Sequence, residues 1–208
     1  MDLADDIIRN LLQPYGINAT REFCSKVRSY VELLLRWNQK ISLTTTTDPE
    51  EILRFHFGES IFATAAVPIA FGRLADVGTG AGFPGLPIKL VRPDIDVLLI
   101  ESNLRKTVFL SEAVRVMAID RVEVVRSRAE EISEATPPFD FITARAVGRH
   151  ENLLSWASGR LSPAGRVLLW LGEEGARTIS KNSGWNWADP LHIPGSNNRY
   201  ILHGSKKP

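Results

Sequence analysis

The sequence predicts an α/β protein in which a doubly wound, mostly parallel sheet follows a small helical region. Three observations carry this prediction. Short apolar runs alternate with amphipathic stretches from residue 73 onward, residues 1–67 have the pattern of packed helices, and a glycine-rich loop directly follows the first apolar run. Continuous apolar strands that alternate with helices are typical of parallel sheets covered on both faces. We therefore expect a helical N-terminal region at residues 1–67 and a ligand-binding sheet domain at residues 68–208.

The helical region contains two start signals. Thr20 is a suitable N-cap for a first helix. The apolar positions of this helix recur at helical spacing, at Phe23, Val27, Val31, Leu34 and Leu35. Asp48, followed by Pro49, is the second start signal, and we expect the helix that it opens to continue towards Ala66.

Short apolar runs predict the strands of the sheet, at residues 74–77, 96–101, 122–125, 139–144 and 167–171. Amphipathic helices are expected between most of them, notably over residues 105–119 and 151–160. Two more strands, at about residues 187–193 and 199–203, flank a Pro-Gly-Ser-Asn-Asn turn signal. Because a short turn joins them, we expect these two strands to pair antiparallel.

The composition is that of a globular chain, with 44% hydrophobic and 24% charged residues. No apolar run approaches the roughly 20 residues that span a bilayer, and the acidic N-terminus differs from a secretory signal. Cys24 is the single cysteine, which excludes an intramolecular disulfide, and the histidines lack metal-ligand spacing. We therefore expect a cytoplasmic protein without a metal site. A formal net charge of +1 argues against a large non-specific nucleic-acid surface but permits a local basic patch.

The glycine-rich loop and a downstream acid predict a ligand site. Residues 76–82 read Asp-Val-Gly-Thr-Gly-Ala-Gly, and Glu101 ends the second expected strand, 19 residues after Gly82. In a doubly wound sheet, ligands bind beyond the carboxyl ends of the strands, where glycines let the backbone approach closely. An acid at the tip of the second strand accepts the hydroxyl hydrogens of a ribose. The pair therefore predicts a site for a ribose-bearing cofactor.

Two cofactors satisfy this pattern. Residues 80–85 also match the Gly-x-Gly-x-x-Gly dinucleotide fingerprint, so an NAD-dependent oxidoreductase with Glu101 on the adenosine ribose stays open. Three features favour S-adenosylmethionine instead. Pro84 and Pro87 delay the helix whose N-terminus a pyrophosphate needs, and the carboxylate of Asp76 repels a pyrophosphate but attracts a cation. S-adenosylmethionine carries an ammonium and a sulfonium group and no phosphate.

A family resemblance extends over most of the chain. The motif at residues 76–87 resembles that of the bacterial glucose-inhibited division protein B family, which are small-subunit ribosomal RNA guanine-N7 methyltransferases. Four further blocks resemble the family in the expected order: Trp37-Asn38 with Leu43-Thr44, and residues 54–60, 126–131 and 139–146. Within residues 54–60, Glu59 stands where the family usually has aspartate.

The resemblance implies a class I methyltransferase (Rossmann-like) fold with an antiparallel final strand, S-adenosylmethionine as cofactor, and small-subunit ribosomal RNA or the 30S particle as substrate. Arg145 is the implied catalytic residue, in a positioning role that also contacts the cofactor. The remaining cofactor-binding candidates are Asp76, Gly78, Gly80, Gly82, Phe83, Glu101, Ala129 and Glu130. Basic residues expected near strand ends are the RNA-binding candidates: Arg105, Lys106, Arg128 and Arg149. We expect a monomer.

Two segments depart from the family pattern. The family usually has Gly-Lys-Arg after the acid of the second strand, where this chain has Leu104-Arg105-Lys106. After the fifth strand the family usually has lysine-glycine, whereas Leu171-Gly172 is followed here by two glutamates. The second departure removes a cation from an edge that is expected to face RNA.

The implied reaction needs no general base, because guanine N7 has an in-plane lone pair and bears no hydrogen. Alignment and the exclusion of water are then the main tasks of the protein. We expect Arg145→Ala to lower turnover strongly while the fold survives. A methyltransferase with a non-RNA substrate and a non-catalytic nucleoside-binding module remain alternatives, because the glycine loop does not identify the acceptor.

Overall fold

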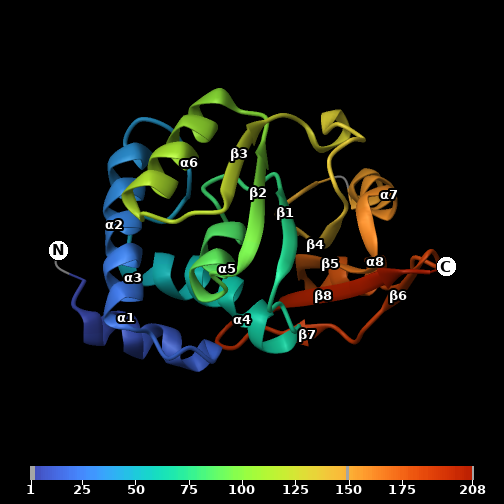
Figure 1. Ribbon diagram of the computed structural model, residues 1–208. Helices are drawn as coiled ribbons and strands as arrows, with labels where there is room; N and C mark the ends of the chain where they lie inside the picture. Colours follow the sequence, from blue (N-terminus) through green and yellow to red (C-terminus); the bar gives the residue numbers. More distant parts are fainter. Residues whose placement is uncertain (1–2, 149, 208) are drawn as a thin grey trace.

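The computed structural model describes residues 3–148 and 150–207 (Figure 1). The N-terminal region forms α1 (Asp5–Leu12), the short 3-10 helix η1 (Gln13–Tyr15) and α2 (Arg21–Asn38). A continuous helical run follows, made of α3 (Pro49–Glu51), the π-helical segment η2 (Ile52–Gly58) and α4 (Glu59–Ala66). The expected helix from Asp48 to Ala66 is therefore confirmed, with a π-helical segment in its middle.

One sheet forms the centre of the remaining part of the molecule. Its strands are β1 (Gly72–Val77), β2 (Ile95–Glu101), β3 (Val122–Arg126), β4 (Phe139–Arg145), β5 (Leu161–Gly172), β6 (Trp185–Trp187), β7 (Leu191–His192) and β8 (Arg199–Lys206). They lie in the order β3-β2-β1-β4-β5-β8-β6, with β7 paired to β8. β1 to β5 pair in parallel, and β8 is antiparallel to β5, β6 and β7. The predicted doubly wound, mostly parallel sheet is confirmed.

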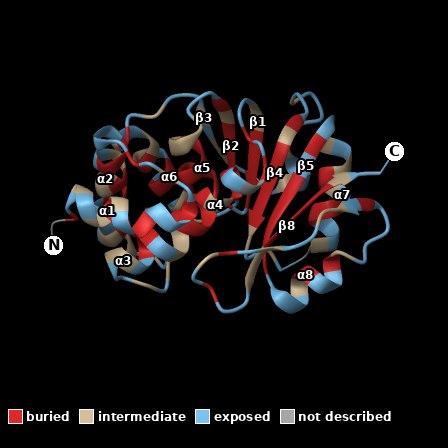
Figure 2. Cartoon of the chain, turned by 90° about the horizontal axis from the view of Figure 1, so that it is seen from below, coloured by how far each residue is buried: buried red, intermediate tan, exposed pale blue. Residues whose placement is uncertain are grey.

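Helices cover both faces of the sheet (Figure 1). They are α5 (Gly85–Val91), α6 (Leu104–Val116), η3 (Ala129–Glu131), α7 (His150–Arg160) and α8 (Glu173–Ile179). One core cluster joins the N-terminal helices, α5 and α6 to the sheet, and a second joins α7 and α8 to the opposite face. Successive residues of β2 belong to different clusters, because side chains along a strand point alternately to the two faces of the sheet. Leu99 lies in the first cluster, and Leu98 and Ile100 lie in the second. Figure 2 shows these strands as the buried centre of the molecule.

The C-terminal part differs in detail from the prediction. The strand expected at about residues 187–193 is two short strands, β6 and β7, and both pair antiparallel with β8. β5 begins at Leu161, earlier than expected, and the short helix α8 follows it directly. Local patterns identify the buried centre of these strands more reliably than their ends.

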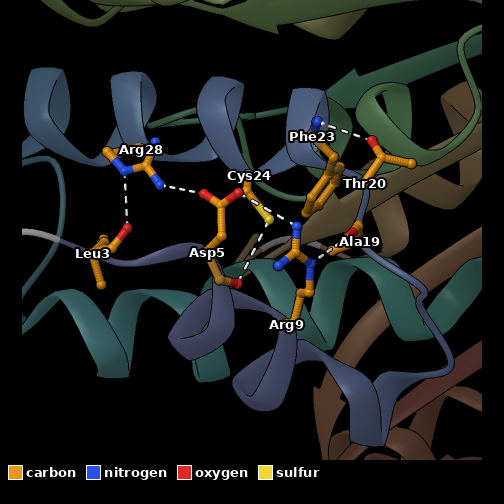
Figure 3. A network of polar contacts seen from close by, with 8 residues as sticks. All are labelled: Leu3, Asp5, Arg9, Ala19, Thr20, Phe23, Cys24 and Arg28. Carbon is orange, nitrogen blue, oxygen red and sulfur yellow. Dashed lines mark hydrogen bonds and ion pairs between the residues drawn. The ribbon is translucent and has the colours of Figure 1, made fainter.

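A network of polar contacts fixes the beginning of the helical region (Figure 3). Thr20 caps α2, because its Oγ1 accepts a hydrogen bond from the Phe23 backbone N–H at 3.1 Å. Asp5 lies between two arginines, with Oδ1 at 2.5 Å from Arg28 Nη2 and Oδ2 at 3.3 Å from Arg9 Nη2. These contacts tie α1 to α2.

Trp37 joins the helical region to the sheet domain. Its indole Nε1 donates to Glu112 Oε2 on α6 at 2.8 Å, and its ring meets the Phe109 ring edge-on at 6.0 Å. Trp37 therefore packs the helical region onto the sheet domain. The boundary proposed at residue 67 remains a prediction, since the first core cluster draws residues from both sides of it.

Candidate active site

The glycine loop lies at the carboxyl edge of the parallel strands. Val77 at the end of β1 pairs in register with Ile100 of β2 and Ala144 of β4, so the loops after these strands meet at the same edge. Gly78, Gly80 and Gly82 have φ angles of +66°, +60° and +96°, in the left-handed region that glycine tolerates best. The backbone turns sharply here, and α5 begins only at Gly85.

Asp76 holds this loop in place through hydrogen bonds from inside the protein. The side chain is fully buried; Oδ2 accepts hydrogen bonds from Thr79 Oγ1 at 2.5 Å and from the Gly85 N–H at 2.9 Å, and Oδ1 accepts one from Thr143 Oγ1 at 2.8 Å. Burial raises the pKa of Asp76 to about 6, although these hydrogen bonds oppose the shift. Its carboxylate is therefore directed into the protein, where it connects both ends of the loop to β4.

Glu101 closes the other side of the loop. Oε2 accepts a hydrogen bond from the Gly80 N–H at 3.1 Å, and Oε1 accepts one from the Asn103 N–H at 2.8 Å. Each carboxylate oxygen can accept a second hydrogen bond. The side chain is thus held rigidly in place with acceptor capacity left for a ligand.

A cleft of about 850 Å³ opens beside these residues. It brings together several predicted site residues: Gly78, Glu101, Arg128, Ala129 and Glu130. The volume is within the usual range for small-molecule sites. The opposite wall was not predicted from the sequence; α7 supplies it through Asn152, Leu153, Ser155 and Trp156. The sequence predicts a helix over residues 151–160, but no local pattern shows that one face of a helix lines a cleft.

The cleft residues fit a nucleoside with a cationic tail better than a pyrophosphate. At Gly78, an added Cβ would make only an ordinary contact with Val147 Cγ2 at 3.5 Å, and the positive φ of +66° is what favours glycine at this position of the cleft wall. The wall also offers apolar surface from Ile100, Leu153 and Trp156 for a base. Two carboxylates, Glu101 and Glu130, line it beside Arg128. The carboxylate oxygens can accept hydrogen bonds from ribose hydroxyls and attract a positive charge.

Phe83 lies in an aromatic cluster with the helical region. Its ring stacks on His56 at 4.8 Å and meets the rings of Tyr30 and Phe57 edge-on at 5.6 Å each. The Tyr30 hydroxyl also donates to the Ala81 carbonyl of the loop. The helical region thereby supports the glycine loop from the side opposite to α7.

Gly82 packs against the helix that follows the loop. A Cβ there would come within 2.3 Å of Leu86 Cδ1. Five predicted cofactor-binding residues are absent from the lining of the cleft, so their predicted contact with the cofactor remains untested: Asp76, Gly80, Gly82, Phe83 and Arg145.

Arg145, at the end of β4, takes part in a buried group of charges. Its Nη2 lies 3.3 Å from Glu59 Oε2, and Arg199 Nη2 lies 2.8 Å from Glu59 Oε1. Burial raises the pKa of Glu59, while the two guanidinium groups oppose that shift. The sequence analysis placed Arg145 at the site but did not connect it with Glu59 or Arg199, because the three residues come from distant segments.

His56 borders the same charges. Its Nε2 lies 2.8 Å from Thr44 Oγ1, and Nδ1 is buried without a hydrogen-bond partner among the described residues. Burial, together with the nearby Arg145 and Arg199, lowers the pKa of His56 to about 3. The imidazole is therefore neutral at physiological pH.

The basic RNA-binding candidates lie at two neighbouring strand ends. Arg105 and Lys106 are in the first turn of α6, after β2, and Arg128 follows β3. Arg105 and Arg128 are exposed and Lys106 is half-buried. Arg149 lies outside the described residues. Binding of RNA by these side chains remains a prediction.

The two glutamates after β5 have a local structural role. Glu173 and Glu174 occupy the first turn of α8, where the helix dipole favours acids. Arg199 of β8 pairs in register with Gly172, so a cation from another strand stands at the edge where the sequence analysis found one missing.

Comparisons with known proteins agree with this geometry. Residues 23–189 match the GidB family, described as rRNA small subunit methyltransferase G. A protein of that name from Xanthomonas campestris pv. campestris (strain B100) is 35% identical over 192 residues, which cover 90% of this chain and 88% of the relative. Its counterpart from Xanthomonas axonopodis pv. citri (strain 306) is 36% identical over 200 residues, which cover 93% of this chain and 92% of the relative.

The fold also recurs in solved structures. A precorrin-6y C5,15-methyltransferase from Geobacter metallireducens GS-15 superposes with a TM-score of 0.60 at 15% identity, covering 80% of this chain and 91% of that one. At this identity the likeness shows the fold alone. The family match, by contrast, spans most of the chain and includes the glycine loop, Glu101 and Arg145. The chain therefore belongs to the GidB family of small-subunit ribosomal RNA methyltransferases.

Proposed function

We propose that this protein methylates N7 of a guanine in small-subunit ribosomal RNA, with S-adenosylmethionine as the methyl donor. The observation that carries the proposal is the cleft at the carboxyl edge, which is lined by Gly78 and by Glu101, whose carboxylate is held by the Gly80 N–H. Membership of the GidB family supports the reaction class and the ribosomal RNA substrate. Because ribosomes are assembled there, the proposal places the protein in the cytoplasm.

Different residues of the cleft contact different parts of the cofactor. Glu101 accepts the ribose hydroxyls, Gly78 lets the cofactor approach the backbone, and Ala129 and Glu130 meet the adenine region. Trp156 and Leu153 shield this side from water. When bound, S-adenosylmethionine supplies an electrophilic methyl group.

The protein contributes alignment rather than proton transfer. N7 of guanine is a nucleophile without deprotonation, so no residue has to act as a general base. Orientation of two reactants can lower a barrier by roughly 7–11 kcal/mol. Positive charge moves onto the purine as the methyl arrives, and a nearby carboxylate stabilises that charge. Glu59, the buried carboxylate paired with Arg145, is the candidate for this role.

Two measurements test the proposal. Calorimetric titration with S-adenosylmethionine and with NAD separates a methyltransferase from an oxidoreductase, and we expect binding of the first only. Transfer of labelled methyl groups is then compared for 30S subunits, naked ribosomal RNA and bulk protein, with N7-methylguanine identified in the digested product. Glu101→Gln should weaken cofactor binding. Preferential binding of NAD, or methylation of protein alone, would overturn the proposal.

No helix in the described part of the chain is long and apolar enough to cross a membrane.

A further inference from the structure

Glu59 joins two arginines that come from different strands. It is the first residue of α4, Arg145 ends β4 and Arg199 begins β8. The two carboxylate oxygens are divided between the arginines, with Oε2 at 3.3 Å from Arg145 Nη2 and Oε1 at 2.8 Å from Arg199 Nη2. Only 2% of the Glu59 side chain is exposed. Both contacts are ion pairs, and Glu59 Oε1 has no hydrogen-bond partner among the described residues, so the carboxylate holds the two guanidinium groups together through charge.

The group retains a positive charge and unused donors. One carboxylate offsets only one of the two guanidinium charges. Arg145 Nη1 is buried and has no hydrogen-bond partner among the described residues. A buried donor without an acceptor costs free energy, which a ligand oxygen can recover. Arg199 is 38% exposed, and its guanidinium stacks on Phe55 at 4.8 Å from the ring centroid.

The group adjoins the glycine loop. Arg145 directly follows Ala144, which pairs with Val77 at the start of the loop. Burial raises the pKa of Asp76, which supports the same loop, and the charge of Arg145 is close enough to oppose that rise. On the other side, His56 lies near both arginines and stacks on Phe83. Both guanidinium groups are thus close to the loop that the proposed function places against the cofactor.

We propose that Glu59 is a positioning residue which presents Arg145 and Arg199 as a paired donor site for the target nucleotide of the RNA. Arg145, recessed and with a free donor, contacts the carbonyl oxygen of the base. Arg199, more exposed, contacts a backbone phosphate. Arginine suits both acceptors because its planar group offers several donors. This inference rests on the proposed function and adds the residues that bind its substrate.

Glu59 also keeps the arginines compatible with the reaction. A bare guanidinium beside a purine that gains positive charge would oppose methyl transfer. Paired with Glu59, Arg145 keeps its N–H donors while much of its charge is offset. A solely structural ion pair would have no such influence on turnover.

The chain contains a matched control for this arrangement. Asp5 is also a carboxylate between two arginines, at 2.5 Å from Arg28 and 3.3 Å from Arg9 (Figure 3). It ties α1 to α2, and its side chain is 27% exposed, whereas that of Glu59 is 2% exposed. Asp5→Asn and Glu59→Gln therefore each remove one carboxylate charge that two arginines share, in the N-terminal helices in the first case and in the proposed substrate site in the second.

The experiment measures binding and turnover separately in full-length variants. Thermal unfolding is recorded first, and all assays are run well below the lowest midpoint. S-adenosylmethionine affinity is measured by calorimetry, RNA affinity by filter binding to 30S subunits, and kcat and KM by methyl transfer. We expect Glu59→Gln to weaken RNA binding and to lower kcat/KM about 100-fold, with unchanged cofactor affinity. Glu59→Asp, which keeps the charge, should recover part of the loss.

Two further variants complete the test. Arg199→Gln should weaken RNA binding and reduce its dependence on salt, because one phosphate contact is lost. Asp5→Asn should leave RNA binding and kcat unchanged even where it lowers the unfolding midpoint. Unchanged RNA binding and kcat in Glu59→Gln would overturn the inference, as would equal losses in Asp5→Asn. If the wild-type protein neither binds S-adenosylmethionine nor methylates RNA, the proposed function itself fails.

Discussion

At the scale of single residues, Asp76 is predicted to contact the ligand, but its carboxylate is bound within the fold. Its position at the end of β1 predicts a carboxylate that faces a cationic ligand. In the structure, three hydrogen bonds from Thr79, Gly85 and Thr143 surround the carboxylate inside the protein. We therefore interpret Asp76 as the residue that shapes the loop, while Glu101 keeps acceptor capacity towards the cleft.

Two substitutions of Asp76 should distinguish the stability that comes from its hydrogen bonds from the effect of its charge. Asp76→Asn keeps an acceptor for the Gly85 N–H and removes a buried charge, so we expect a small change in the free energy of unfolding at pH 7. Asp76→Ala leaves that N–H unpaired and should lower the free energy of unfolding by about 1–3 kcal/mol relative to Asp76→Asn. Urea denaturation measures both, and equal stability of the two variants would contradict this assignment.

His56 should make stability dependent on pH. Its pKa is about 3 in the folded protein, below the ordinary value of 6.5. Between these values the unfolded chain binds a proton that the folded protein does not. The free energy of unfolding is therefore highest, as far as His56 determines it, above pH 6.5. It falls by about 1.4 kcal/mol for each unit by which the pH drops below that value.

The measurement compares the wild type with His56→Gln, which does not titrate, by urea denaturation from pH 7 to pH 4. The wild type should lose stability relative to the variant as the pH falls. A constant difference across this range would show that His56 titrates normally.

At the scale of elements, the helical region supports the site as well as covering the sheet. The Tyr30 hydroxyl of α2 donates to the carbonyl of Ala81 in the glycine loop. The π-helical segment η2 carries His56 and Phe57, whose rings contact Phe83 at the end of that loop. The helical region, which the sequence predicts as separate from the sheet domain, therefore packs directly against the glycine loop.

Tyr30→Phe should therefore affect the cofactor site as well as stability. The variant keeps the ring but leaves the buried Ala81 carbonyl without its donor, which costs about 1–3 kcal/mol. We expect the free energy of unfolding to fall by this amount and S-adenosylmethionine to bind more weakly, as measured by denaturation and calorimetry. Trp37→Phe, which removes the hydrogen bond to Glu112 on α6, is the control and should leave cofactor affinity unchanged. Equal cofactor affinity in Tyr30→Phe and the wild type would contradict the role assigned to α2.

At the scale of the whole molecule, the sequence predicts features that depend on local patterns. The apolar runs of β1 to β5, the cap at Thr20 and the glycine loop are short-range signals, and each is found where it was expected. The wall that α7 adds to the cleft and the contact of Glu59 with both arginines depend on the packing of distant segments. No spacing in the sequence brings residues 59, 145 and 199 together.

The charge distribution leads to a further prediction. Basic and acidic residues nearly balance, with 25 of the first and 24 of the second, but Arg105, Lys106 and Arg128 follow adjacent strands at the edge that carries the site. RNA affinity should fall as the salt concentration rises, because bound phosphates release counterions. Cofactor affinity should change little. Filter binding and calorimetry across a salt series measure the two responses, and RNA binding that is insensitive to salt would count against a basic RNA surface.

The position of β8 has a consequence for synthesis of the protein. This strand lies between β5 and β6, although it is the last strand along the chain. Until residues 199–206 have left the ribosome, β5 presents an open edge to other nascent chains, and exposed edges promote aggregation. A translation product that stops before Arg199 should therefore be insoluble and degraded, although it already contains the glycine loop and Glu101. Only a chain that includes residues 199–206 supplies both the missing strand and the second arginine of the Glu59 group.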